Sequence, residues 1–431
     1  MKKFFKNTMY SLFGKAVGMF SLMILDIFLA RSLPAEYYAE WAFFFSVLTI
    51  LFFVGWLGIN SSSKVYISRY RDHRQQTECI KSALFLRFVL SLVVSCGIAV
   101  AMPGIMKVQN FSDKYPDLKA LFIYSGFLVF FNSFTEFYKE IFVGLGWFKR
   151  LFVLTITEYL GYLCFTIFFS VRANSVLSVA LGYLLTGILV FVTGFCFVCR
   201  EYDLFNTLQS TSRFHYVRPI AKYAIPMFLI GIGVVILIEI DTFMLGIFSD
   251  KHQLAIYNIA KNLNAKLCHV NYSVAVGTMT TFAVIDQNTV DKQRSQFQKI
   301  NLINLLLTAG IAAVIFLCTP FFVKILYGAA YADAGFITRA LIPYYVLYSL
   351  STFFATFLDF RGKAGVRSLA YIGIILLDIF FNYQLIPRYG ALGAAIATSL
   401  SLFPYAVIMI IMSFHEWGIY KRQKKELGDS L

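Results

Sequence analysis

The sequence predicts an all-α polytopic membrane protein of about 12 transmembrane helices, arranged as two six-helix bundles with pseudo-two-fold symmetry. Three observations lead to this prediction: the composition, the regular spacing of apolar stretches, and an internal repeat. Of the 431 residues, 59% are hydrophobic and only 14% are charged, and the mean hydropathy is +0.70. Soluble domains have about 45–50% apolar and about 25% charged residues. This composition leaves little chain for an aqueous domain and argues against a soluble enzyme.

Apolar stretches that approach the thickness of a bilayer alternate with short, charged connectors along the chain. About 20 apolar residues in a helix span the hydrocarbon core. We expect helices at residues 12–30, 41–60, 84–105, 119–137, 152–171, 177–199, 223–246, 262–284, 300–323, 337–357, 368–386 and 393–414.

Basic residues gather on alternate connectors. If the chain has twelve helices, about two thirds of the 38 Lys and Arg residues lie on the side of the membrane that holds both termini. This count assigns Arg87 and Lys139 to connectors on that side. Because Lys and Arg mark cytoplasmic loops, we expect both termini in the cytoplasm of a multi-pass protein of the bacterial cytoplasmic (inner) membrane. The same bias explains most of the net charge of +15, so we expect no nucleic-acid partner.

A short repeat relates the two halves of the chain. The segments LDIFL, ending at Leu29, and IDTFM, ending at Met244, each close an apolar stretch and place Asp26 and Asp241 at matching positions. Many transporters are built from such repeats, with the substrate site where the repeats meet. The repeat predicts an N-terminal bundle over residues 1–210 and a C-terminal bundle over residues 211–431.

Several ionisable residues fall within the expected helices, where they cost several kcal/mol unless they face protein or water. Lys15 and Asp26 are about three helical turns apart and share a face. Lys266 and His269 also share a face, with no acidic residue within a turn, which favours a polar lumen. The other such residues are Arg31, Glu158, Glu239, Asp241 and Asp378.

Plainer readings of these residues stay open. Lys15 and Arg31 could extend to the lipid headgroups. Asp26 and Asp241 could be helix-end carboxylates in contact with water, although their matching positions favour a shared role. Glu158 and Asp378 could each pair with a cation of a neighbouring helix.

Motifs for common soluble chemistry are absent from the sequence. It has no GxxxxGK[ST] phosphate loop, no GxSxG and no HExxH. Cys196 and Cys199 form a lone CxxC without the further ligands that zinc needs, so we expect no metal site. A membrane enzyme such as a polysaccharide polymerase would need a large outer loop, and the longest expected outer connector, residues 103–118, is short. We therefore expect a protein that is not an enzyme and has no cofactor.

Four segments resemble polysaccharide flippases. Ala30–Ala39 (ARSLPAEYYA) is similar to the stretch after their first helix, and Trp56–Asn60 (WLGIN) is similar to the turn after their second. Tyr223–Pro226 (YAIP) looks like the opening of their second half. The most specific match is Asn382–Thr398, which is similar to the N-x-x-L-I-P-x-x-G-x-x-G-A-A-I-A-T signature of the O-antigen (Wzx-type) flippases. These belong to the multidrug/oligosaccharidyl-lipid/polysaccharide (MOP) exporter superfamily.

The resemblance implies twelve helices in two bundles around a central cavity. It further implies transport of a polyprenyl-pyrophosphate-linked oligosaccharide repeat unit, for O-antigen and lipopolysaccharide or a similar surface polysaccharide, from the inner to the outer leaflet. A proton or sodium gradient would drive alternating access. In that scheme Lys15, Lys266, His269 and Arg31 would bind the anionic substrate, and Asp26, Asp241, Glu158 and Asp378 would couple the ion or gate the path.

Two further expectations accompany this one. The partners would be the lipid-linked oligosaccharide, membrane lipids and, as a further possibility, a polysaccharide polymerase and chain-length proteins. The alternative function is a drug/cation antiporter of the same superfamily. Such an antiporter favours an acidic pocket, for which Asp26 and Asp241 leave room, whereas Lys15 and Lys266 argue against it.

Overall fold

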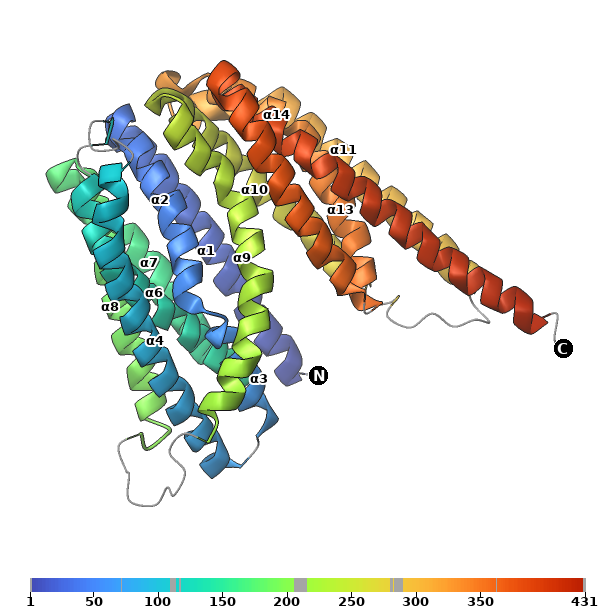
Figure 1. The fold of residues 1–431 in the computed structure, drawn as a ribbon, viewed down its shortest axis with the longest axis horizontal. Helices are drawn as coiled ribbons and strands as arrows, with labels where there is room; N and C mark the ends of the chain where they lie inside the picture. The colour runs from blue at the N-terminus through green and yellow to red at the C-terminus, as the bar shows by residue number, and fades with distance from the viewer. Residues whose placement is uncertain are drawn as a thin grey trace. The chain divides into compact units, whose positions relative to one another are not determined.

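The computed structural model describes residues 2–70, 72–108, 114–115, 118–204, 215–279, 282, 290–361 and 363–428. Within these ranges the regular structure is helical and there is no strand (Figure 1), so the all-α prediction is confirmed. The elements are α1 Lys2–Ser32, α2 Ala35–Trp56, α3 Ile59–Arg69, α4 His73–Val108, α6 Leu118–Gly144, α7 Phe148–Ala173, α8 Val176–Cys199, α9 Val217–Phe248, α10 Lys251–Met279, α11 Val290–Leu326, η3 Ala329–Tyr331, α12 Ala334–Ala340, α13 Ile342–Phe360 and α14 Ala364–Gly428.

Nine of the twelve expected stretches coincide with a helix or part of one. The stretches 41–60 and 337–357 each run across a break between two helices, α2–α3 and α12–α13, and 262–284 ends beyond the described part of α10. In the described part of the chain, 8 helices are long and apolar enough to cross a bilayer, or up to 9 if the bent pair Ala329–Ala340 and Ile342–Phe360 is one span. This number is below the expected twelve for two visible reasons. Leu369–Ile419 counts as one span although it bends at Gly390, and α6 and α10 are not among the helices that are apolar enough over their described residues. The protein is a multi-pass membrane protein; the cytoplasmic location of its termini stays a prediction.

The chain forms two compact units, Met1–Val235 and Ile236–Leu431. The boundary falls inside α9 because the first part of α9 packs on α3: the hydroxyl of Ser62 donates to the carbonyl oxygen of Ile220 at 2.6 Å. The boundary expected after residue 210 falls among residues 205–214, which lie outside the described ranges, so the division into 1–210 and 211–431 stays a prediction.

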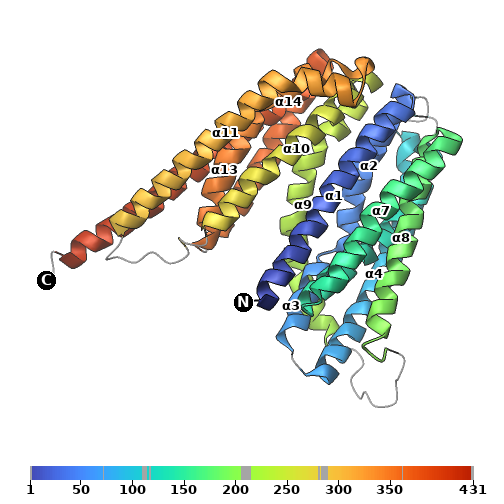
Figure 2. The same cartoon turned by 180° about the vertical axis from the view of Figure 1, so that it is seen from behind.

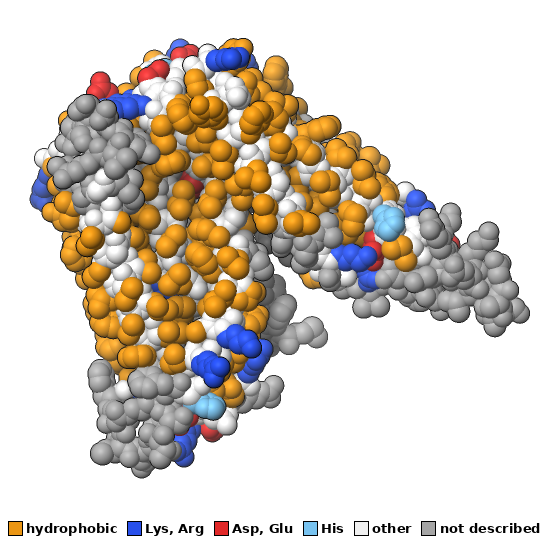
Figure 3. Space-filling model, in the orientation of Figure 1, with side chains coloured by type: hydrophobic (Ala, Val, Ile, Leu, Met, Phe, Trp, Pro, Cys, Tyr) orange, Lys and Arg blue, Asp and Glu red, His pale blue; other side chains and the backbone are white. Residues whose placement is uncertain are grey.

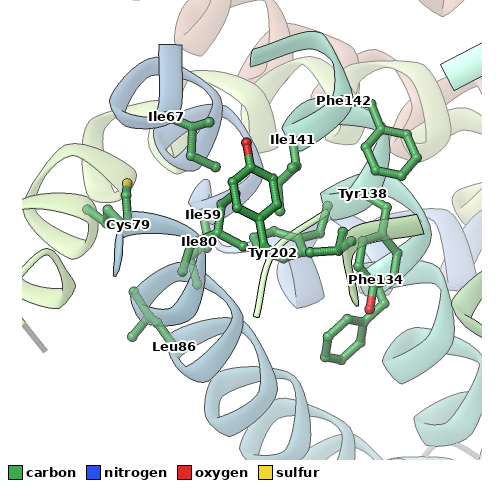
Figure 4. Close-up of a cluster of buried hydrophobic side chains, with 14 of the residues drawn as sticks. Ile59, Ile67, Cys79, Ile80, Leu86, Phe134, Tyr138, Ile141, Phe142 and Tyr202 are labelled. Atoms are coloured by element: carbon green, nitrogen blue, oxygen red, sulfur yellow. The ribbon is translucent and has the colours of Figure 1, made fainter. Parts of the chain in front are cut away.

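The first unit has its core between α3, α4, α6, α8 and the start of α9. Fully buried side chains from these helices, including Ile67, Ile80, Phe137 and Ile141, form one cluster. Figure 4 shows part of it, with Ile67 and Ile141 lying close together and Tyr202 beside them. On another side of the unit α7 packs on α8, and α1 packs on α7, as Figure 2 shows.

The second unit has a separate aromatic core that joins α11, α13 and the last part of α14. Phe297 and Phe357 lie with ring centroids 4.9 Å apart, and Trp417 stacks on Phe357 at 5.5 Å. Outside this core, long rows of apolar side chains are exposed, such as Leu306 and Leu317 on α11. Figure 3 shows apolar side chains over most of the visible face and basic ones near helix ends, as expected for helices surrounded by lipid.

Two breaks in helices position the polar groups described next. Leu57 and Gly58 both adopt left-handed φ values, 48° and 70°, which end α2 and start α3 in a new direction. A Cβ at Gly58 would lie 2.1 Å from the carbonyl oxygen of Ala224, so only glycine fits. Gly390 has φ 54° and ψ −130° and bends α14 into two arms.

Candidate functional site

Asp241 of α9 lies at the centre of a buried polar cluster in the second unit. Its side chain accepts hydrogen bonds from the hydroxyl of Tyr257 (2.7 Å), the hydroxyl of Thr398 (2.7 Å) and the amide of Asn382 (2.6 Å). Asp241 is only 2% exposed. Three neutral donors therefore stabilise a carboxylate at membrane depth, where an unpaired one would be costly.

A second buried carboxylate, Asp378, joins this cluster. It is fully buried, accepts a hydrogen bond from the hydroxyl of Ser401 at 3.0 Å, and lies close enough to Asp241 for the two carboxylates to interact. Among the described residues, Oδ2 of Asp378 and Oδ1 of Asn382 have no hydrogen-bond donor. Two neighbouring buried carboxylates with free oxygens are unfavourable unless a proton or a cation neutralises one of them.

The segment Asn382–Thr398 brings these groups together. Its first and last residues are the two that donate to Asp241 from α14, one from each arm. Gly390 makes the bend, and the carboxamide oxygen of Gln253 accepts a hydrogen bond from the backbone N–H of Ala391 at 3.0 Å, which anchors the bend to α10. The two arms therefore meet at Asp241.

Lys261, which is not among the predicted site residues, connects α10 to α9 close to Asp241. Lys261 of α10 forms an ion pair with Glu239 at 2.8 Å and donates to the hydroxyl of Thr242, also at 2.8 Å. Glu239 and Thr242 flank Asp241 in the sequence. The positive charge of Lys261 thus neutralises the negative charge of Glu239. Among the described residues, no lysine or arginine forms a hydrogen bond with Asp241 or Asp378.

In the first unit, Asp26 accepts a hydrogen bond from the hydroxyl of Tyr38 at 3.0 Å. Both repeat-related aspartates therefore accept from a tyrosine of the next long helix. Asp26 is only partly buried.

Glu158 of α7 forms a buried ion pair with Lys139 of α6 at 2.6 Å, and Lys139 also pairs with Glu136 at 2.6 Å. Glu158 is 4% exposed. The reading in which Glu158 pairs with a cation of a neighbouring helix is confirmed. The same reading for Asp378 is wrong, because its described partners are Ser401 and Asp241. The placement of Lys139 in a connector was wrong, because it lies inside α6 and is held there by the two glutamates.

The placement of Arg87 in a cytoplasmic connector was also wrong. It lies in α4, is 0% exposed, and donates to the carbonyl oxygen of Trp56 (2.9 Å), to that of Gly55, to the hydroxyl of Ser91 (2.9 Å) and to Asn60 (3.3 Å). The guanidinium thus satisfies carbonyls at the end of α2, which would otherwise be unpaired in a dry interior.

The predicted substrate-binding residues are not brought together by any described contact. Lys15 and Arg31 are both exposed on α1. Lys266 and His269 fall on α10, but their side chains lie outside the described residues. The roles assigned to these four residues stay predictions. No cluster of three or more His, Cys, Asp or Glu side chains that could hold a metal occurs in the described part of the chain.

Sequence reasoning found Asp241 and Asp378 but missed Tyr257, Thr398, Asn382 and Ser401 as their partners. The sequence could have pointed to two of these partners, since Asn382 and Thr398 are the polar residues at the two ends of the most specific motif. Lys261 could have been found from its location within an apolar stretch, where a lysine needs a partner.

Comparison with known families now identifies the chain. Residues 4–277 match the family model described as "Polysaccharide biosynthesis protein". The chain belongs to this family. The resemblance of this polysaccharide biosynthesis family protein to polysaccharide flippases is thereby confirmed.

The chain also matches a curated protein that is named as a flippase. It is 24% identical over 175 residues to "Probable flippase AglR" of Haloferax volcanii, a match that covers 38% of this chain and 35% of that protein. The match thus spans about a third of the relative's length.

Solved structures show the fold. An inward-facing MATE-family multidrug transporter of the MOP superfamily superposes with a TM-score of 0.74 at 15% identity, covering 93% of this chain and 95% of that one. The lipid II flippase MurJ, in an inward closed conformation, gives 0.71 at 15% identity, with 96% and 90% covered. The chain therefore has the fold of the MOP superfamily. The relatives named here are flippases and transporters, in agreement with the expected non-enzymatic role.

Proposed function

We propose that this protein flips a polyprenyl-pyrophosphate-linked oligosaccharide, a repeat unit of O-antigen or a similar surface polysaccharide, from the inner to the outer leaflet of the bacterial inner membrane. Membership of the polysaccharide biosynthesis family and the MOP fold support a transporter of this kind. The single observation that carries a coupled mechanism is the buried pair Asp241 and Asp378 with its free oxygens.

We infer that the Asp241 cluster is the site at which a gradient drives transport. Hard cations such as sodium prefer oxygen ligands, and the cluster offers oxygens of Asp241, Asp378, Asn382 and Thr398. A proton on one carboxylate would satisfy the same charge requirement. Because neutralising the cluster removes the repulsion between the two carboxylates, binding the ion favours one packing of α9 against the arms of α14 over another.

The substrate is anionic at its pyrophosphate, so a path of basic side chains suits it. Lys15, Arg31, Lys266 and His269 are the residues we propose for this role. Reversing the charge of Lys15 or Lys266 would then repel the pyrophosphate.

Complementation of a strain lacking the gene tests the proposal. We expect the deletion strain to lose surface polymer and to accumulate lipid-linked repeat units. The wild-type gene should restore the polymer, whereas Lys15→Glu and Lys266→Glu should not. Lys149→Glu is the matched control, because Lys149, like Lys15, is exposed and it lies outside the proposed path. Normal surface polymer in the deletion strain, together with raised sensitivity to cationic drugs, would favour the antiporter instead.

The coupling ion requires a separate measurement. Purified protein in proteoliposomes is given either a sodium gradient or a proton gradient, and substrate movement is followed under each. Transport that needs sodium, and is lost in Asp378→Asn, assigns sodium to the cluster. Transport that needs only the proton gradient, and is lost in the same variant, assigns the proton. Equal transport without either gradient would contradict the coupling role.

A further inference from the structure

The first unit contains a basic pocket that the proposed transport function does not use. It lies between α3 and the start of α9, has a volume of about 580 Å³, and is lined by Tyr66, Arg218, Pro219, Lys222, Tyr223 and Pro226. All six residues belong to the unit Met1–Val235.

The charges in this pocket are unfavourably arranged for the protein alone. Arg218 and Lys222 are one turn apart on α9, a spacing at which like charges repel. Arg218 also lies in the first turn of the helix, where the helix dipole disfavours cations, and this turn has no acidic residue. In the described part of the chain neither side chain forms an ion pair. A bound anion would relieve both kinds of repulsion.

The rest of the pocket wall consists of two tyrosines and two prolines. The rings of Tyr66 and Tyr223 are arranged edge to face with centroids 6.3 Å apart. The guanidinium of Arg69 lies 4.9 Å from the centroid of Tyr66, on α3. Tyrosine and arginine at such a position are typical of the headgroup level of a membrane protein.

Beyond the basic end, the same face of α9 becomes apolar. Ile225 and Leu229 follow Arg218 at positions i+7 and i+11, so they extend the face that Arg218 and Lys222 begin. They are 63% and 64% exposed. Two cations followed by an exposed apolar stripe along a membrane-spanning helix match the layout of one lipid, a charged headgroup followed by a hydrocarbon chain.

We propose that this pocket binds the phosphate headgroup of an anionic membrane phospholipid, with an acyl chain lying along Ile225 and Leu229. Arg218 and Lys222 supply charge-assisted hydrogen bonds to the phosphate. The lipid would fasten the start of α9 to α3 and so stabilise the part of α9 that belongs to the first unit. This inference does not depend on which substrate the protein carries.

Native mass spectrometry of the full-length protein with added phosphatidylglycerol tests the proposal. The double variant Arg218→Gln/Lys222→Gln should retain this lipid about thirtyfold less than the wild type, since each basic residue near an anionic headgroup contributes about 1 kcal/mol. Lys292→Gln/Lys299→Gln is the control: it removes the same charge from exposed positions on α11 and should retain the lipid. Unchanged retention in the first variant, or equal loss in both variants, would overturn the proposal.

Two measurements keep the test decisive if the first variant folds poorly. Arg218→Lys/Lys222→Arg preserves both charges and should restore lipid retention. On the wild-type protein, inorganic pyrophosphate should displace phosphatidylglycerol only weakly, because it lacks the chain that contacts Ile225 and Leu229. Full displacement at concentrations equal to the lipid would show a site for soluble phosphates and would overturn the lipid assignment.

Discussion

The hydroxyl of Tyr257 lies 2.7 Å from the carboxylate of Asp241 and donates a hydrogen bond to it. The first unit has a corresponding pair, in which Tyr38 donates to Asp26 at 3.0 Å. The two aspartates occupy matching positions of the internal repeat, but their surroundings differ. Asp241 is buried with a second carboxylate nearby, whereas Asp26 is only partly buried. Both units therefore contain the aspartate–tyrosine pair, and in the second unit this pair belongs to the buried oxygen-rich cluster.

Replacing Tyr257 by phenylalanine should weaken binding of the coupling ion by about tenfold or more, because Asp241 loses a donor that orients it. The ion concentration that gives half-maximal transport measures the effect. Tyr345→Phe is the control, since Tyr345 is equally buried in the second unit but donates to Asn271. Equal shifts in the two variants would argue against a specific role for Tyr257.

Replacing Glu158 by glutamine should destabilise the first unit by about 3–5 kcal/mol, because Lys139 loses a buried counter-charge. The remaining pair with Glu136 favours the lower end of this range. Thermal unfolding in detergent measures the change. Glu140→Gln removes a carboxylate from the more exposed pair with Lys64 and should change stability by about 1 kcal/mol or less. Similar losses in both variants would contradict the assignment.

Replacing Arg87 by methionine should destabilise the junction of α2 and α3. The carbonyl oxygens of Gly55 and Trp56 lose their donor, at a cost of about 1–3 kcal/mol for each buried group left unsatisfied. Proteolysis near Leu57 should then become faster. Arg74→Met, at an exposed position of the same helix, should leave both stability and proteolysis unchanged. An unchanged proteolysis rate in Arg87→Met would show that a different contact stabilises the junction of α2 and α3.

Replacing Gly182 by alanine should separate α7 from α8 and cost about 1–3 kcal/mol. A Cβ at Gly182 would lie 2.6 Å from the Cα of Thr166 and 2.7 Å from its backbone nitrogen, which cannot move without shifting the helix. Gly97→Ala on α4 meets no atom within 4 Å and should be neutral or slightly stabilising. Melting temperatures of the two variants check this pair, and a harmless Gly182→Ala would contradict the close packing of α7 on α8.

Hydropathy was enough to predict where most helices lie, since the described residues of the expected apolar stretches are helical apart from short breaks such as the one at Leu57. The bend at Gly390 falls in the gap between the expected helices 368–386 and 393–414. Hydropathy did not predict the break at Leu57, which lies inside the expected helix 41–60, because the backbone there depends on the close tertiary contact of Gly58 with Ala224. The same limit explains the errors for Arg87 and Lys139. A charge count assigns basic residues to connectors, whereas these two are held inside helices by hydrogen bonds and glutamates that are distant in the sequence.

The two acidic residues of the candidate site could be predicted from the sequence, but the residues that donate hydrogen bonds to them could not. A carboxylate within an apolar stretch is conspicuous, so Asp241 and Asp378 could be singled out. Thr398 and Asn382 are ordinary residues for a membrane helix and become significant only when the bend at Gly390 brings both to Asp241.

We propose that this protein moves a lipid-linked oligosaccharide across the bilayer. The most direct measurement is flipping in proteoliposomes: the protein is reconstituted with a polyprenyl-pyrophosphate-linked oligosaccharide, and an enzyme added outside cleaves the sugars that reach the outer leaflet. We predict that cleavage exceeds the half accessible at the start only with active protein and an ion gradient, and that Asp241→Asn abolishes the excess. Cleavage that stops at the same level with and without the protein would contradict the claim.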